Sequence, residues 1–255
     1  MSKQGEHILV NNGENLLPGF SVDCVILGFH DNLLKVLLLK PKYCDEWALP
    51  GGFVSKEEDV DEAAVKVLKD RTGIADIFLR QFYLFGSKNR NNKVLNTKAL
   101  QFLGEKQNPD SYLLQRFISL GYYALVDFSS TVPQPDSLSD SCEWKEVSDL
   151  PPMILDHTEM FSRAMTILRS KLNNEPIGYN LLNEKFTITE LQALYETLLG
   201  KRLDRRNFLR RILSYDILIK LDEKKTGVAH KAPNYYSFDT EKYHQALING
   251  LNSGW

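Results

Sequence analysis

Residues 47–74 read WALPGGFVSKEEDVDEAAVKVLKDRTGI, and the rest of the chain is organised around this stretch. The glycine pair at Gly51 and Gly52 predicts a sharp turn, because glycine adopts positive φ at little cost. Ser55 and Glu58 stand three apart before an apolar run, a spacing typical of a helix capping box. The stretch therefore predicts a turn that leads into a capped helix.

The predicted helix has one buried face and a defined end. Its apolar residues recur at helical spacing, which places them on a single stripe. These residues are Val60, Ala63, Ala64, Val67 and Leu68. Gly73 stands where the helix should stop, a position that glycine commonly occupies. We therefore expect a loop, an amphipathic helix and a second loop in direct succession.

This stretch resembles the Nudix box, the loop–helix–loop motif of the Nudix hydrolases. Gly52 and Glu58 match the first glycine and glutamate of the box, and Gly73 and Ile74 match its closing glycine and aliphatic residue, with the family's spacing throughout. Trp47 begins a segment that resembles the lead into the box. A chance combination of loop and helix is the alternative, and the agreement of the flanking sequence favours the family.

The middle of the box departs from the family pattern. Lys66 stands in place of arginine, Val67 in place of glutamate, and Asp70 and Arg71 in place of paired glutamates. The family's glutamates hold Mg²⁺, and hard cations need oxygen ligands. Positions 67, 70 and 71 share one helix face, where valine offers no ligand and a guanidinium repels a cation. We therefore expect no enzyme, with no catalytic residues, no metal and no cofactor.

Size and composition place the chain among ordinary soluble globular proteins. Its 255 residues are 43% hydrophobic and carry a formal net charge of −2, which suits one large domain or two modest ones. Three cysteines without a CxxC pair argue against a zinc site or a disulfide framework. The sequence shows neither a signal core nor a long apolar run. We therefore expect a cytoplasmic protein.

The sequence around the box predicts a sheet. Segments rich in β-branched and aromatic residues are expected to be strands. They are residues 20–29, 35–39, 77–85, 116–126 and 142–147. Asp23 is a polar residue inside the first of these strands, and it either hydrogen-bonds locally or faces a ligand. Residues 156–173 predict an amphipathic helix, and His157 near its start is expected to cap or pack.

A long insertion, residues 86–115, separates two of the predicted strands. Nudix domains usually connect these strands more briefly, and a short helix is expected at residues 95–103. Long connections inside compact domains are usually functional or disordered. We expect the insertion to cover a pocket or to contribute to a dimer interface.

The last third of the chain has a different pattern. Helices are predicted at residues 187–199 and 203–213, and residues 217–221 and 234–238 predict the two strands of a hairpin. Two helices followed by a hairpin are the layout of a winged helix-turn-helix, with the hairpin as the wing. This domain type commonly places its second helix in the major groove of DNA.

Basic charge is concentrated in this region. Residues 201–231 contain ten lysines and arginines against four aspartates and glutamates, the footprint expected of a DNA binder. Arginine suits guanine and asparagine suits adenine at the start of a recognition helix, whereas lysines on a wing are expected to contact phosphates. The expected DNA-binding residues are Lys201, Arg205, Arg206, Asn207, Arg210, Arg211, Lys224, Lys225, His230 and Lys231. The alternative is a solvated basic face without a partner.

A degenerate Nudix domain followed by a winged helix resembles the Nudix-related transcriptional regulators. The resemblance implies an α+β fold: a Nudix-like α/β/α sandwich with a mixed sheet at 1–155, a linker helix at 156–175 and a winged helix-turn-helix domain at 176–255. It implies a homodimeric regulator, either a repressor or an activator, that binds a double-stranded DNA operator and a small-molecule effector. Family members respond to ADP-ribose or to sugars such as arabinose, and the core of residues 67–73 is more similar to the sugar-responsive branch.

The expected effector-binding residues come from the box alignment and from charge near the ends of strands. They are Glu58, Lys66, Asp70, Arg71, Arg90 and Arg116. Two other functions stay open. An active hydrolase of ADP-ribose would use Glu58 and Asp70 with Glu105 or Asp110 as metal ligands. A winged helix that binds only protein would show no steep salt dependence, because it would release no counterions from phosphates.

Overall fold

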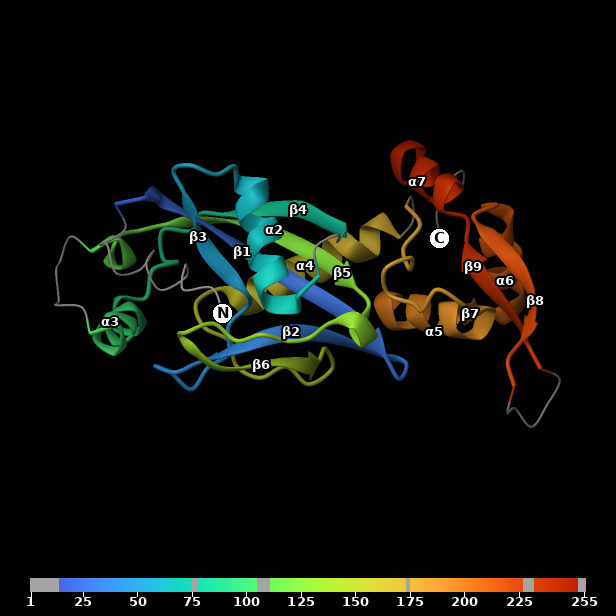
Figure 1. Ribbon diagram of the computed structural model, residues 1–255, viewed down its shortest axis with the longest axis horizontal. Coiled ribbons are helices and arrows are strands. Elements are labelled where there is room, and N and C mark those ends of the chain that lie inside the picture. Colours follow the sequence, from blue (N-terminus) through green and yellow to red (C-terminus); the bar gives the residue numbers. More distant parts are fainter. Residues whose placement is uncertain (1–13, 75–77, 105–110, 173–174, 227–231, 252–255) are drawn as a thin grey trace. The chain divides into compact units, whose positions relative to one another are not determined.

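The computed structural model describes residues 14–74, 78–104, 111–172, 175–226 and 232–251. The chain forms two compact units (Figure 1). Unit 1 runs to Leu27 and contains Lys35–Leu125 and Ser130–Ala164. Unit 2 contains Gly28–Leu34, Val126–Ser129 and the chain from Met165 onward. The predicted domain boundaries at residues 155 and 175 stay predictions.

Unit 1 is built on a six-stranded sheet. The strands are β1 (Leu16–His30), β2 (Leu33–Pro41), β3 (Gly51–Ser55), β4 (Phe78–Phe85), β5 (Ile118–Val126) and β6 (Ser139–Glu146). Their order is β4-β5-β1-β2-β6, and β3 pairs with β1. Helix α2 (Val60–Thr72) lies in front of the sheet in Figure 1, and α4 (His157–Lys171) passes behind it. The expected α/β/α arrangement is confirmed.

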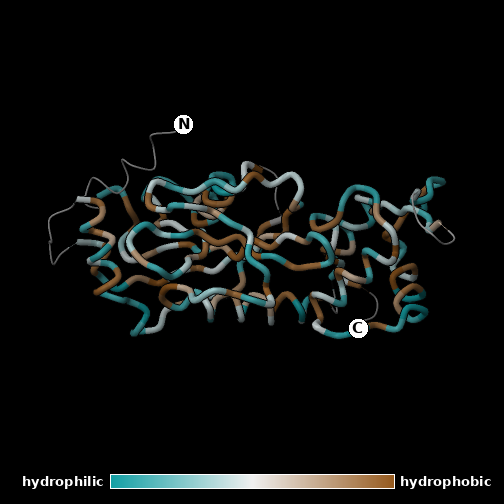
Figure 2. The backbone as a smooth tube through the Cα atoms, turned by 90° about the horizontal axis from the view of Figure 1, so that it is seen from below, coloured by the Kyte–Doolittle hydropathy of each residue, from teal (hydrophilic) through white to brown (hydrophobic). Residues whose placement is uncertain are grey.

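The core of unit 1 lies along its two central strands. Val25, Ile26 and Leu27 on β1 and Leu37 and Leu38 on β2 are completely buried. The strands in the middle of this unit are among the hydrophobic stretches of the chain in Figure 2. Helices of the described stretches do not combine the length and the apolarity that a bilayer crossing requires.

The prediction of a turn at the two glycines is wrong. Gly51 and Gly52 begin strand β3, and neither is among the described glycines with positive φ. Gly51 pairs with Asp23 on β1, and a Cβ at Gly51 would lie 2.2 Å from the Oδ1 atom of Asp23. The close approach of two strands therefore requires the glycine.

The capping box also lies elsewhere. Helix α2 begins at Val60, and its capping box is formed by Asp59 and Glu62, with the backbone N–H of Asp59 donating to the Glu62 carboxylate at 2.9 Å. Ser55 and Glu58 do pair, because the Ser55 N–H donates to Glu58 at 2.7 Å, but they do so in the turn before the helix.

The predicted helix face is largely confirmed. Ala63, Ala64 and Leu68 are buried, whereas Val60 and Val67 are half-buried. Gly73 ends the helix in the left-handed conformation, with φ of 74°.

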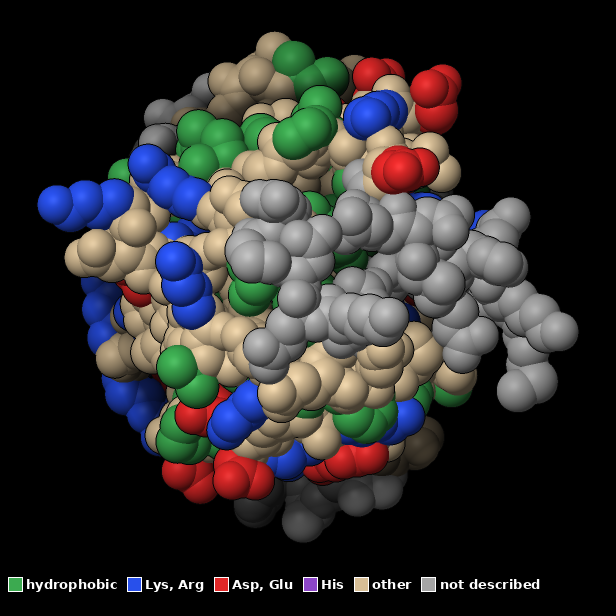
Figure 3. Space-filling model, turned by 90° about the vertical axis from the view of Figure 1, so that its left-hand side faces the viewer, with side chains coloured by type: hydrophobic (Ala, Val, Ile, Leu, Met, Phe, Trp, Pro, Cys, Tyr) green, Lys and Arg blue, Asp and Glu red, His purple; other side chains and the backbone are tan. Residues whose placement is uncertain are grey.

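The insertion contains the short helix that its sequence predicts. Helix α3 (Lys93–Phe102) begins after Asn92, whose side chain accepts a hydrogen bond from the Leu95 N–H at 3.1 Å. The short 3-10 helix η1 (Tyr112–Leu114) follows. Val94 and Phe102 on α3 are exposed. The face on the α3 side shows hydrophobic groups and lysine and arginine side chains together (Figure 3). That the insertion covers a pocket or a dimer interface stays a prediction.

Unit 2 contains the predicted winged helix. Its elements are β7 (Phe186–Thr187), α5 (Ile188–Leu199), α6 (Arg205–Ser214), β8 (Leu218–Lys224), β9 (Asn234–Phe238) and α7 (Thr240–Asn249). The strands form a sheet in the order β7-β9-β8. Thr187 caps α5 together with Glu190, and Asp204 caps α6 by accepting from the Asn207 N–H at 2.9 Å. The sequence predicted both helices and the hairpin, but neither β7 nor α7.

We expect Gly51→Ala to destabilise unit 1 by about 1–3 kcal/mol, because the added methyl group overpacks against the buried Asp23. Gly52→Ala is the matched control, since a Cβ there has no neighbour closer than 3.4 Å. Urea unfolding followed by tryptophan fluorescence measures the difference, because Trp47 and Trp144 both lie in unit 1. Equal unfolding midpoints for the two variants would contradict this account.

Candidate functional site

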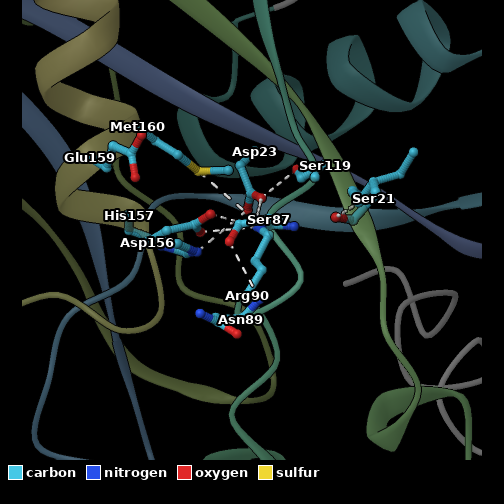
Figure 4. A network of polar contacts seen from close by, with 12 residues as sticks. Ser21, Asp23, Ser87, Asn89, Arg90, Ser119, Asp156, His157, Glu159 and Met160 are labelled. Carbon is cyan, nitrogen blue, oxygen red and sulfur yellow. Dashed lines mark hydrogen bonds and ion pairs between the residues drawn. The ribbon is translucent and has the colours of Figure 1, made fainter.

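A buried arginine lies at the centre of a polar network in unit 1 (Figure 4). The side chain of Arg90 is completely buried. Its Nη2 atom donates to Asp23 at 2.9 Å, and its Nε atom donates to the two oxygens of Asp156 at 2.9 and 3.0 Å. The guanidinium also lies 4.9 Å from the ring centre of Phe117. Two carboxylates therefore compensate one buried cation.

Two neutral groups complete the network around Asp23. The hydroxyl of Ser119 donates to Asp23 at 2.5 Å. The Nδ1 atom of His157 accepts from the Leu49 N–H at 2.9 Å, and its Nε2 atom lies 3.8 Å from Asp23. Burial lowers the pKa of His157, although the nearby Asp23 opposes this shift. His157 is thus a packed hydrogen-bond acceptor, in line with the role expected from its sequence position.

The network joins parts of unit 1 that are distant in sequence. Asp23 comes from β1, Ser119 from β5 and Arg90 from the segment between β4 and α3, while Asp156 and His157 stand at the start of α4. The sequence indicated Asp23 as an unusual polar residue but gave no sign of its partners. Arg90 was expected to bind an effector, and the structure places it as a buried ion-pair partner.

The box residues lie along α2 and the turn before it. The Nζ atom of Lys66 is 3.9 Å from Glu58, so these two expected effector residues are neighbours. Arg71 at the other end of the helix donates to Asp136 at 3.1 Å, and Asp70 is exposed. Arg116 is exposed as well, and donates to a backbone carbonyl at 2.6 Å. The six expected residues are therefore not all brought together.

The described residues contain no group of three or more histidine, cysteine, aspartate or glutamate side chains placed to hold a metal ion. Glu105 and Asp110, which the hydrolase alternative requires, lie outside the described residues. Val67 contributes no oxygen, and Arg71 is held by Asp136. Positions 67 and 71 of α2 therefore offer no carboxylate to a Mg²⁺ ion.

Helix α6 of unit 2 presents basic side chains to solvent. Phe208 and Ile212 are buried and anchor the helix, whereas Arg205, Arg206 and Arg210 are exposed. Because residues four apart share a helix face, Arg206 and Arg210 form a ridge on the side away from the anchors.

Asn207 and Arg211 on α6 form hydrogen bonds within unit 2. The Oδ1 atom of Asn207 accepts from Arg210 at 3.2 Å. Arg211 is half-buried, and its Nε atom donates to the hydroxyl of Tyr215 at 2.8 Å. The exposed ridge is therefore the part of α6 best placed to meet DNA.

The wing is less basic than its sequence indicates. The Nζ atom of Lys225 donates to Glu190 on α5 at 2.8 Å, and this hydrogen bond raises the pKa of the lysine. Lys224 is exposed, as is Lys201 in the turn between α5 and α6. His230 and Lys231 lie outside the described residues.

We expect Arg90→Met to destabilise unit 1 by about 3–5 kcal/mol, because it leaves the buried Asp23 and the half-buried Asp156 without a cation. The matched control is Arg116→Met, which removes an exposed guanidinium and should cost less than about 0.5 kcal/mol. Urea unfolding of the full chain measures both. Similar losses in the two variants would show that the network does not hold unit 1 together.

The depressed pKa of His157 makes stability depend on pH. The folded state resists protonation of this residue, so its contribution is complete above the unfolded pKa of about 6.5 and decreases as the pH falls through that value. Between about pH 7.5 and 5.5 we therefore expect the free energy of unfolding of unit 1 to decrease. His157→Asn keeps an acceptor for the Leu49 N–H and should reduce the loss. An unchanged pH dependence in this variant would contradict the assignment.

Comparison with known proteins agrees with this architecture. Residues 17–164 match the NUDIX domain family, and residues 178–238 match the NrtR DNA-binding winged helix domain. The chain is 27% identical over 234 residues to the ADPR responsive transcriptional repressor NtrR of Acinetobacter baylyi, covering 89% of this chain and 84% of that protein.

Solved structures share the fold over nearly the whole chain. Shewanella oneidensis NrtR is 24% identical with a TM-score of 0.72, covering 93% of this chain and 100% of its own. The same protein complexed with a 27mer DNA also gives 0.72 at 24% identity, with 92% and 99% covered. A MutT/nudix family protein from Enterococcus faecalis gives 0.63 at 18% identity, with 94% and 99% covered. The chain belongs to the NUDIX family and carries a winged helix domain of the NrtR type after its Nudix domain.

Proposed function

We propose that this protein is a DNA-binding transcriptional repressor whose Nudix domain binds an effector without hydrolysing it. The observation that carries the proposal is the ridge of exposed arginines on α6, in a domain that matches a DNA-binding winged helix. The repressor from Acinetobacter baylyi is similar to this chain over 84% of its own length. An active hydrolase would need oxygen ligands where α2 offers valine and a paired arginine.

ADP-ribose is the proposed effector. The relative from Acinetobacter baylyi is described as ADPR responsive, and this supports ADP-ribose over the sugar that the core of the box favoured. A diphosphate carries negative charge, which suits the proposed basic contacts Lys66 and Arg116 at accessible positions of unit 1. Glu58 and Asp70 are proposed to accept from ribose hydroxyls. Arg71 and Arg90 are positioning residues, because each is held by a carboxylate.

Two continuous elements offer a route from the effector domain to the reader domain. Strand β1 carries Asp23 in unit 1 and continues into unit 2, and helix α4 begins with His157 in unit 1 and ends in unit 2. Within unit 2, the Nε atom of Arg169 on α4 donates to the carbonyl of Leu198 on α5 at 2.8 Å. We propose that the effector binds one arrangement of the Arg90 network more tightly than another. This difference in affinity would change the conformation of α5 through these two elements and release the DNA.

The proposed partners are a double-stranded operator and a second copy of the chain. Two-fold symmetry of a homodimer would place two winged helices on the half-sites of a palindrome in the cytoplasm. Arg205, Arg206, Asn207 and Arg210 are proposed to contact bases or phosphates. Lys201, Arg211, Lys224, Lys225, His230 and Lys231 are proposed to act through phosphates alone.

Arg206→Ala should weaken binding to the preferred DNA sequence by about 5- to 100-fold, because it removes a guanidinium from the exposed ridge. The control is Arg202→Ala, since Arg202 lies before α6 and pairs with Glu196 at 3.3 Å. Fluorescence anisotropy at a fixed salt concentration measures both. If the Arg206 variant bound DNA with wild-type affinity, the assignment of α6 as the helix that contacts DNA would be wrong.

The absence of hydrolysis is a second expectation of the proposal. Incubation of the purified full chain with ADP-ribose and millimolar Mg²⁺ should release no AMP above a protein-free control. The reason is that Val67 and Arg71 replace carboxylates that a cation needs. Mg²⁺-dependent release of AMP would instead establish the hydrolase function.

A further inference from the structure

Helix α6 exposes two leucines on the side that carries its arginines. Leu209 is 37% exposed and Leu213 is 44% exposed, although the helix belongs to a well-packed domain. Both differ from Phe208 and Ile212, which are almost completely buried and anchor the helix. The leucines therefore leave a substantial part of their apolar surface open to solvent.

Helical spacing places the leucines beside the basic ridge. Positions 206, 209, 210 and 213 are related by three and four residues, so their side chains are neighbours on one side of α6. Around the helix axis, both leucines lie between Arg205 and Arg206, so they flank the ridge of Arg206 and Arg210. The outer surface of this helix is therefore a strip of apolar area bordered by guanidinium groups.

The chemistry of this strip selects an occupant. Exposed guanidinium groups favour a partner that carries many negative charges. A wholly apolar partner surface carries none. Within the major groove of DNA, the C5-methyl group of thymine is the one apolar group on the base edges, and aliphatic side chains contact it. A polyanion with methyl groups on the floor of its groove matches both parts of the strip.

We propose that Leu209 and Leu213 read thymine methyl groups, so that A·T pairs contribute to the sequence that α6 recognises. This inference rests on the proposed DNA-binding function and adds to it a source of specificity that the arginines do not supply. Burying one methyl group against a leucine should contribute about fourfold in affinity for each thymine contacted.

The test replaces thymine by deoxyuridine, which removes only the methyl group. The full chain first selects its preferred duplex from a random library, and each thymine of that duplex is then replaced in turn. We expect about fourfold weaker binding at one or two positions in each half-site for the wild-type protein. The sensitivity at those positions should disappear in Leu209→Ala or Leu213→Ala and persist in Arg206→Ala.

Ile248→Ala is the matched control, because Ile248 is an exposed aliphatic residue on α7, outside the strip. It should retain the full difference between thymine and deoxyuridine. The inference is overturned if no position responds to deoxyuridine, or if the response survives in both leucine variants. The latter result, together with a loss of oligomers or of a bound protein, would assign the strip to a protein partner. If the protein shows no salt-sensitive DNA binding at all, the proposed function itself is overturned. This outcome differs from the two results above, because both of them require a protein that binds DNA.

Discussion

The ion pairs of Arg90 connect unit 1 across its whole sequence. The arginine is separated by 67 positions from Asp23 and by 66 from Asp156, and all three side chains meet in the interior. A buried guanidinium without these partners would cost several kcal/mol, so the insertion, the central strand and the start of α4 must be in place together. Asp23 in turn needs the space that Gly51 leaves. The glycine before the Nudix helix is therefore also required for this network to form.

The regular elements were predictable where a side-chain pattern is long enough to repeat. Apolar periodicity indicated α2, α5 and α6, and runs of β-branched and aromatic residues indicated the hairpin of β1 and β2. Strand β7 contains two residues, too few to show any alternation. Gly51 illustrates a different limit, because a glycine needed for close strand approach looks the same in sequence as one needed for a turn. Likewise, Ser55 with Glu58 and Asp59 with Glu62 offer two capping boxes, and only the folded structure distinguishes them.

The site was less predictable than the fold because it depends on pairs distant in sequence. A polar Asp23 within an apolar strand was a visible signal, whereas its partner Arg90 looked like any surface arginine. Similarly, Lys225 counted as free basic charge until Glu190 on α5 was found beside it. On α6 the sequence indicated the arginines by charge. The leucines between them acquire meaning only from their exposure, which the sequence does not reveal.

The central claim is that one molecule joins an effector domain to a DNA reader. The most direct measurement is fluorescence anisotropy of the complex between the full chain and its preferred duplex, titrated with ADP-ribose at constant salt. The account predicts that ADP-ribose releases the duplex at a saturable concentration, and that a pentose of the sugar-responsive kind leaves the complex intact. A complex that ADP-ribose does not change, formed by a protein that nevertheless binds ADP-ribose, would contradict the account.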